Sequence, residues 1–166
     1  MKQLFLLLLA VPLLFSACKK EDKCPYTESS ASATAQERLD LQAYLTVNSI
    51  SAIEDPSGVY YNITPQGTGA NPSICSNVTV KYTGSLIPTG SIFDSTPAGS
   101  STSFTLGQLI VGWQKVLPQL KMGGKITMYI PPSLGYGSNP VRNSNGVIVI
   151  PANSYLQFDV ELINVQ

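Results

Sequence analysis

The residues of this chain that could support chemistry are mainly aromatic. The sequence contains no histidine and only three cysteines. Histidine is the usual general base near neutral pH and a frequent metal ligand, so its absence argues against both kinds of site. Tyr82, Trp113 and Phe158 instead stand in apolar segments, where they favour core packing or the binding of an apolar group. We therefore expect no metal and no cofactor.

The charge balance limits the class of partner. Ten basic and ten acidic side chains cancel, and charged residues make up only 12 % of the chain. A nucleic-acid-binding protein needs a positive surface, so no nucleic-acid partner is expected. The length of 166 residues suits one compact domain with a short appendage. Frequent glycine and proline predict many turns and few helices.

The first residues are typical of an export signal. Lys2 precedes the apolar run 4–15, which is too short to span a bilayer and matches the apolar part of a secretory signal. Phe15-Ser16-Ala17-Cys18 then resembles the bacterial lipobox, in which the cysteine is acylated and becomes the new terminus. The alternative is an ordinary cleaved signal followed by a chance cysteine. We predict a signal peptide at 1–17 and lipidation of Cys18.

The charged tract at 19–23 leaves two interpretations open. It resembles the surface-export signals of Bacteroidetes lipoproteins, and it is equally compatible with a solvated spacer. In either case the protein is expected in the cell envelope, lipid-anchored to the outer membrane on its periplasmic or surface face. If Cys18 is acylated, Cys24 and Cys75 remain. An exported compartment permits a disulfide between them, and two free thiols are the alternative.

The rest of the chain divides into three predicted parts. Residues 18–35, rich in Ser, Thr and Ala, are predicted to be a lipidated tether and linker. Residues 36–56 are predicted to be a helical lead-in, because Leu41 and Leu45 recur at helical spacing. That face could dock on the domain or pair with a second copy. Residues 57–166 are the predicted main domain.

Alternation of apolar and polar residues predicts β-strands within that domain. One helix interrupts them, since an apolar stripe at helical spacing runs from Trp113 to Leu120. Pro118 lies within the stripe, so the helix must be short, begin late or be distorted there. A sheet with one helix on its concave face is an α+β architecture. The predicted strands are 59–63, 78–83, 103–106, 125–130 and 155–162.

These elements, in this order, resemble the FKBP-type peptidyl-prolyl isomerase domain. The resemblance covers roughly residues 57–165 and implies a twisted antiparallel sheet wrapping one short helix. It is carried by VTVKYTGSL at 78–86, FDS at 93–95, FTLG at 104–107, IVGW at 110–113, MGGK at 122–125, IPP at 130–132, GYG at 135–137, IPAN at 150–153 and LQFDVEL at 156–162.

The resemblance also implies a pocket and assigns its residues. Trp113 matches the floor on which the proline ring sits. Asp94 matches the acid beside the carbonyl of the bond being turned. The Ile110 backbone N–H and the Tyr136 hydroxyl match the groups that hold substrate carbonyls. The walls would be aromatic at Tyr82, Phe93 and Phe158 and aliphatic at Leu109, Ile110 and Ile150.

Two departures from the family pattern concern the rim of this pocket. Thr102 stands where an aromatic residue is common, so one wall is expected to be lower. The loop between Tyr136 and Ile150 is long, and Asn145-Gly146 between apolar residues predicts a tight hairpin in it. Because this loop overhangs the pocket in the family, substrate preference does not follow from the resemblance.

The function implied by the resemblance is peptidyl-prolyl cis-trans isomerisation of exported proteins. The partners would be proline-containing segments of those proteins, and macrolide inhibitors could occupy the same pocket. A peptide-binding chaperone lipoprotein with weak or no catalysis is the alternative, because Thr102 and the long loop leave turnover open.

Overall fold

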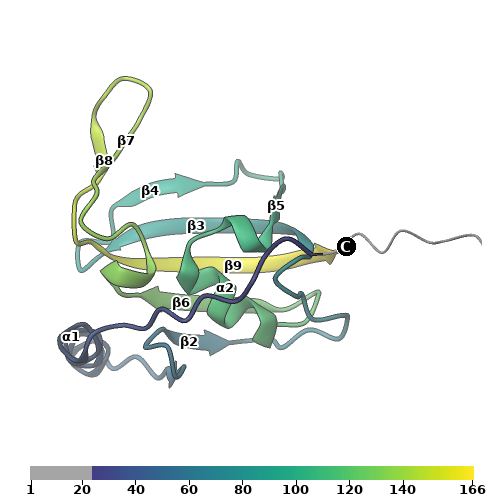
Figure 1. Ribbon diagram of the computed structural model, residues 1–166, viewed down its shortest axis with the longest axis horizontal. Helices are drawn as coiled ribbons and strands as arrows, with labels where there is room; N and C mark the ends of the chain where they lie inside the picture. Colours follow the sequence, from purple (N-terminus) through teal and green to yellow (C-terminus); the bar gives the residue numbers. More distant parts are fainter. Residues whose placement is uncertain (1–23) are drawn as a thin grey trace, which may run out of the picture.

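The computed structural model describes residues 24–166, so the predicted signal peptide and the predicted lipidation site Cys18 lie outside the described residues. Seven strands form an antiparallel sheet in the order β1-β2-β6-β9-β3-β4, with β5 also paired to β3. Figure 1 shows this sheet curving around a short helix. The strands are β1 (Ile53–Glu54), β2 (Tyr60–Ile63), β3 (Asn77–Ile87), β4 (Ile92–Ser95), β5 (Thr102–Thr105), β6 (Lys125–Ile130) and β9 (Tyr155–Val165).

The long central strands β3 and β9 carry the core because their side chains alternate. Val78 and Val80 on β3 are fully buried, as are Leu156 and Leu162 on β9. Polar residues occupy the positions between them and face outward. This period of two places one apolar row of each strand on the same concave face.

That concave face is covered by α2 (Val111–Val116), which continues into the 3-10 helix η2 (Leu117–Gln119). The change of helix type falls at Pro118, because proline has no N–H to continue an α-helix. A Cβ on Gly112 would lie 2.6 Å from the Ile130 side chain, so this glycine lets α2 approach β6 closely. The α+β prediction is confirmed, and the helix is short and distorted at the proline.

A second helix, α1 (Ala35–Val47), lies at the end of the sheet where β6 ends and β9 begins. Thr34 caps it, accepting a hydrogen bond from the Glu37 amide while the Glu37 carboxylate accepts one from the Thr34 amide. Leu41 and Leu45 are buried against Tyr60 and Tyr129 of the sheet. Of the two alternatives for this face, the structure therefore shows it docked on its own domain.

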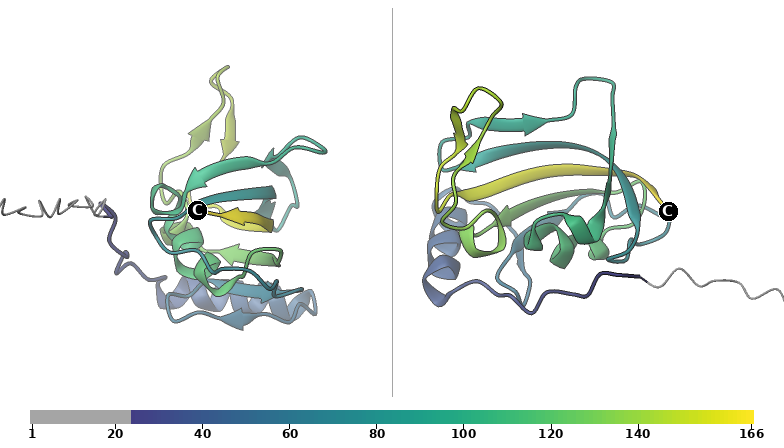
Figure 2. Two further views of the ribbon diagram at one scale, coloured as in Figure 1. Left: turned by 90° about the vertical axis from the view of Figure 1, so that its right-hand side faces the viewer. Right: turned by 45° about the horizontal axis from the view of Figure 1, so that its top comes forward.

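Residues 24–33, which we call the strap, join the amino-terminal side of the chain to α1. Both views in Figure 2 and the view in Figure 1 show the strap running along the helix side of the molecule, past α2. A disulfide links Cys24 at its start to Cys75, with 5.7 Å between the Cα atoms. No helix within residues 24–166 has the length and apolar character to cross a membrane.

The remaining elements are short and lie on the loops. β7 (Val141–Arg142) and β8 (Ile148–Ile150) pair as a separate hairpin that projects from the body of the molecule (Figure 1). Gly146 in its turn has a φ of 77°, which glycine adopts without strain. The predicted hairpin is thus confirmed. The two other 3-10 turns are η1 (Leu106–Gln108) and η3 (Pro132–Leu134).

Candidate functional site

Five aromatic rings meet between the sheet and α2, and we call them the aromatic cluster. Trp113 and Phe158 are each 4 % exposed and cross at 81°, with ring centroids 5.3 Å apart. Tyr82 stands edge-on to Trp113 at 5.8 Å and 86°. Such edge-to-face contacts are the favoured geometry of aromatic pairs. The cluster is completed by Phe93, 5.5 Å from Phe158, and by Phe104, 6.0 Å from Tyr82.

The spacing of these rings depends on Gly84 in the centre of the sheet. Gly84 pairs with Phe158 of β9 on one side and with Asp94 of β4 on the other. A Cβ on Gly84 would lie 2.7 Å from the rings of both Phe93 and Phe158, which is closer than real carbon contacts allow. The β3–β4 register also shifts after Gly84, as at β-bulges that re-aim side chains near active sites.

The aliphatic side of the cluster comes from the turn that precedes α2. Leu109 and Ile110 are half-buried and pack against the main core, together with Ile150 at the end of β8. The Gln114 side-chain amide donates to the carbonyl oxygens of Gly107 and Leu109, at 3.3 and 2.6 Å. Within residues 24–166 the Ile110 N–H donates no hydrogen bond. This donor is therefore open to a ligand.

A second open donor is the Tyr136 hydroxyl. Tyr136 follows η3, and its loop is fixed by a hydrogen bond from the Asn153 backbone N–H to the Gly137 carbonyl, 2.8 Å long. Its side chain is 37 % exposed, and its hydroxyl has no partner among the residues that the structure describes. Burial, followed by the negative charge of Asp94, raises the pKa of Tyr136. The hydroxyl is therefore protonated and able to donate at neutral pH.

The Asp94 carboxylate is held by Tyr82. The Tyr82 hydroxyl donates to Asp94 Oδ2 at 2.5 Å. Burial and this hydrogen bond raise the pKa of Tyr82 well above its usual range. Asp94 is exposed on β4, so its carboxylate is oriented by the hydrogen bond from Tyr82 and not by burial. It can adjust the local field while Tyr82 remains neutral.

The structure thus places the predicted site residues in one region, and two residues were missed. The FTLG motif gives Phe104 no individual role, although Phe104 lies opposite Val78 in the β3–β5 pair and its ring lies 6.0 Å from that of Tyr82. Gly84 likewise belongs to a motif without a role of its own. A glycine among strand-forming residues is the sequence signal for a close approach of neighbouring groups at this position. Thr102, which stands where the family often has an aromatic residue, is half-buried on β5. The predicted residues that contact one another are Tyr82, Phe93, Asp94, Trp113 and Phe158. Tyr136 lies close enough to Asp94 for that charge to raise its pKa, and Leu109, Ile110 and Ile150 pack against the same main core.

A hollow on the outer face of the sheet has a different character. Its volume is about 380 Å³, and polar side chains such as Lys81, Thr127 and Asp159 line it. These alternate along the strands with the inward apolar row. Tyr82 is the one member of the aromatic cluster among its lining residues, so this hollow does not share the chemistry of the cluster.

Comparisons with known proteins agree with the geometry. The chain is 36 % identical over 150 residues to the FKBP-type peptidyl-prolyl cis-trans isomerase FkpA of Buchnera aphidicola, covering 89 % of this chain and 56 % of that protein. It is 39 % identical over 112 residues to the outer membrane protein MIP of Legionella longbeachae, covering 67 % of this chain and 46 % of that protein. The chain therefore spans about half the length of these curated relatives.

The crystal structure of FkpA from Escherichia coli superposes with a TM-score of 0.66 at 36 % identity, covering 80 % of this chain and 60 % of that one. The model of the FKBP-type peptidyl-prolyl cis-trans isomerase family matches residues 69–163, which is more than half of the chain. The strap, α1, β1 and β2 lie before this match. From residue 69 onward the sequence motifs, the fold and the cluster all agree, and the chain belongs to the FKBP-type peptidyl-prolyl cis-trans isomerase family.

Proposed function

We propose that the chain is a peptidyl-prolyl cis-trans isomerase that acts on exported proteins. The observation that carries this proposal is the aromatic cluster together with two donors that have no partner within residues 24–166, the Ile110 N–H and the Tyr136 hydroxyl. A proline ring is apolar and lacks an N–H. A dry aromatic surface therefore suits the ring, while the two donors suit the carbonyl groups of the flanking backbone.

The proposed mechanism needs no covalent step. Rotation about the bond before proline is slow because the amide has partial double-bond character, with a barrier of about 18–20 kcal/mol. Twisting the bond breaks this resonance and reduces charge separation in the amide. An apolar site therefore favours the twisted form relative to water. Catalysis follows when the pocket binds the twisted amide more tightly than either planar isomer.

The polar groups would orient the bound peptide. The Ile110 N–H and the Tyr136 hydroxyl would each hold a backbone carbonyl on one side of the bond, so that binding energy opposes planarity. Asp94, fixed by Tyr82 at 2.5 Å, would lie beside the carbonyl of the turning bond and shape the field there. No proton leaves or joins the substrate in this scheme.

A proline-peptide isomerisation assay with the full chain tests the proposal. The chain should accelerate cis-to-trans conversion, and a macrolide directed at the pocket should abolish the acceleration. A Trp113→Ala variant should lose both the catalysis and the macrolide effect. Conversion at the uncatalysed rate by a folded chain would overturn the isomerase proposal.

A second candidate function is that of a peptide-binding chaperone with weak or no turnover. Exposed apolar residues on β4 and on the β7–β8 hairpin favour it, namely Ile92, Val147 and Ile148, which are 66, 58 and 45 % exposed. Such residues suit the binding of unfolded segments. Suppression of the aggregation of a denatured client without acceleration of proline isomerisation would support this function over the first.

We further propose that the protein is exported and anchored by lipid at Cys18 to the outer membrane. The apolar run 4–15 and the small residues before Cys18 support this. One relative is also described as an outer membrane protein. Radiolabelled palmitate should enter the membrane-bound protein, and Cys18→Ala should remove both the label and the membrane association. Membrane association that survives this substitution without label would contradict the anchor.

A further inference from the structure

The strap reaches the segment that precedes α2 from outside the part of the chain that matches the family. It comprises residues 24–33, whereas the family match begins at residue 69. The strap lies on the side of α2 that faces away from the sheet (Figure 2). Its contacts connect it to the segment 106–110, which presents Leu109 and the open Ile110 N–H.

The first contact involves Tyr26. A Cβ added to Gly107 would fall on the Tyr26 ring, so ring and backbone are in direct contact. The Gly107 N–H donates to the Ile74 carbonyl at 2.8 Å, and the next residue, Cys75, is joined to Cys24 by the disulfide. The disulfide thus holds Tyr26, two residues after Cys24, against the backbone it touches.

The second contact joins the strap to α2. The Lys115 ammonium, two residues from Trp113, donates to the Ser29 carbonyl. A cavity of about 410 Å³ lies around this contact, bounded by strap residues 28–32 and by Pro118 and Gln119. Because of this cavity, the strap touches the domain at separate points, and its contact with the segment 106–110 is made by Tyr26.

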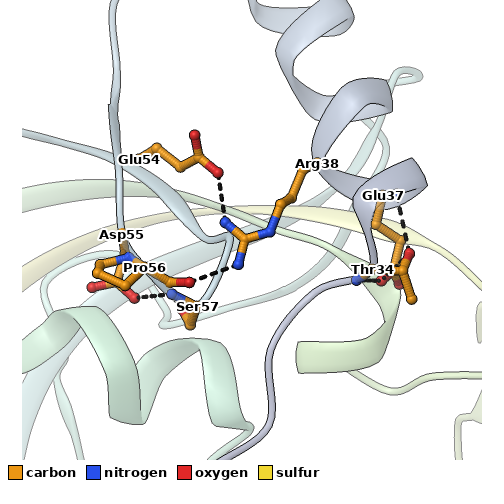
Figure 3. A network of polar contacts seen from close by, with 7 residues as sticks. All are labelled: Thr34, Glu37, Arg38, Glu54, Asp55, Pro56 and Ser57. Carbon is orange, nitrogen blue, oxygen red and sulfur yellow. Dashed lines mark hydrogen bonds and ion pairs between the residues drawn. The ribbon is translucent and has the colours of Figure 1, made fainter.

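The far end of the strap is fixed by the start of α1. The Ala33 N–H donates to the Ser57 carbonyl at 2.7 Å. Figure 3 shows the Arg38 guanidinium reaching from α1 to the Glu54 carboxylate and the Pro56 carbonyl, both at 2.6 Å. With both ends held, the strap cannot slide away from Gly107 without breaking one of these contacts.

From these contacts we infer that Tyr26 is a positioning residue of the isomerase site. Clamped by the Cys24–Cys75 disulfide, its ring holds the backbone at Gly107 and, through it, the Leu109 side chain and the Ile110 N–H. Glycine has the greatest backbone freedom of any residue, so this turn needs support from outside. Gln114 supports it from the helix side, and Tyr26 supports it from the strap side. The inference rests on the proposed isomerase function.

The test compares Tyr26→Ala with the unmodified full chain, and it uses activity and amide hydrogen exchange. We expect Tyr26→Ala to lower kcat/KM on a proline peptide about tenfold, mainly through kcat, because a displaced donor affects the twisted amide most. Exchange at the Gly107 and Leu109 amides should accelerate about tenfold or more, while exchange in β9 stays unchanged. Tyr26→Phe should restore both values, because the ring supplies the contact.

Thr27→Ala is the matched control, because Thr27 is the next residue in the strap and is exposed. It should leave activity and exchange unchanged. Reducing the disulfide should lower the activity of the unmodified chain and add little to the effect of Tyr26→Ala. If Tyr26→Ala does not fold, Tyr26→Leu keeps an apolar side chain but not the flat ring, and the same changes are expected.

The two measurements separate this inference from the proposed function. Unaltered exchange at Gly107 and Leu109 in the folded Tyr26 variant overturns the inference, whatever the activity. Faster exchange with kcat/KM within twofold of the unmodified chain also overturns it. If the unmodified chain lacks isomerase activity altogether, the proposed function fails and Tyr26 loses its role in catalysis with it.

Discussion

The aromatic cluster and the projecting hairpin β7–β8 differ in how they are held. Trp113 and Phe158 are each 4 % exposed, whereas Val147 and Ile148 at the hairpin are 58 and 45 % exposed. Three rings of the aromatic cluster are carried by the long paired strands β3 and β9 and by α2. The hairpin β7–β8 pairs only with itself (Figure 1). One region can keep rings in a fixed geometry, and the other can adapt to what approaches it.

This difference suggests a division of roles in the proposed reaction. Lowering the barrier requires fixed surroundings, since small displacements weaken binding of the twisted amide. Recognition of varied client proteins requires a surface that tolerates different side chains beside the proline. Substitutions in the cluster should therefore change stability and rate together, and substitutions of the exposed hairpin residues Val147 and Ile148 should change substrate preference alone.

The largest effect is expected for Phe158→Ala. Phe158 contacts Trp113, Tyr82 and Phe93 within the cluster. Its removal from a packed core should lower the free energy of unfolding by about 3–5 kcal/mol. The variant should also lose about a hundredfold or more in kcat/KM, because the neighbouring rings lose their support. Chemical denaturation and the peptide assay measure the two effects.

Val147→Ala serves as the control for this variant, since Val147 is an exposed hairpin residue. It should change the free energy of unfolding by no more than about 0.5 kcal/mol. A Phe158 variant of full activity would show that the cluster is ordinary core and not part of the site.

A smaller effect is expected for Gly84→Ala. The added Cβ would lie 2.7 Å from two phenylalanine rings, so the rings must move. Overpacking of this kind lowers the free energy of unfolding by about 1–3 kcal/mol, and we expect kcat/KM to fall about tenfold as the pocket changes shape. Ser85→Ala, at the next position of β3, should have little effect on either quantity. Equal effects of the two substitutions would remove the special role of Gly84.

Gly84 also shows what could and could not be predicted from the sequence. Alternation along 78–83 and 155–162 revealed both central strands, because each buries one face. The four-residue strand β4 escaped, since its residues have no comparable buried row. Glycine is needed at position 84 because the rings of Phe93 and Phe158, from two other strands, leave no room for a Cβ. The pattern of residues along one strand holds no information about such a contact between strands.

The strap illustrates the same limit more strongly. Tyr26 lies in a segment rich in Ser, Thr and Ala, which predicts a linker. Its partner Gly107 stands far along the sequence, and the disulfide that brings them together joins positions 51 residues apart. The contact between Tyr26 and Gly107 therefore orders this segment, whereas its composition alone predicts a linker.

Tyr136→Phe separates chemistry from stability at the edge of the cluster. The hydroxyl has no partner among the described residues, so its loss should leave the free energy of unfolding within about 0.5 kcal/mol. A donor lost from the transition state should lower kcat/KM about fivefold to tenfold, as expected for one hydrogen bond. Activity equal to that of the unmodified chain would exclude the hydroxyl as a carbonyl donor.

Tyr155→Phe is the matched control, because the Tyr155 hydroxyl donates to Asp40 at 2.8 Å, between β9 and α1. This substitution should cost about 1 kcal/mol of stability and leave the rate unchanged. The two tyrosines should therefore show opposite patterns.

At the hairpin we expect a change of preference instead of a general loss. Replacing Val147 and Ile148 together by serine removes exposed apolar surface without disturbing the core. The rate on peptides with a large apolar residue beside proline should fall about twofold to fivefold, and the rate on peptides with alanine there should stay constant. A peptide series that differs only at this residue measures the change. Equal losses on all peptides would argue that the hairpin shapes the pocket itself.

The smallest effect is expected from pH. The chain has no histidine, and no step of the proposed mechanism moves a proton, so kcat/KM should vary by less than about twofold between about pH 6 and 8. At higher pH the relevant group is Tyr136, whose pKa burial and the Asp94 charge raise above its ordinary value of 10.0. A raised pKa keeps the neutral, donating form until the pH passes that ordinary value. The rate should therefore fall only above about pH 10, and in Tyr136→Phe this fall should be absent. A bell-shaped profile centred near neutrality would instead require a titrating catalytic group, and the dry-pocket mechanism would be wrong.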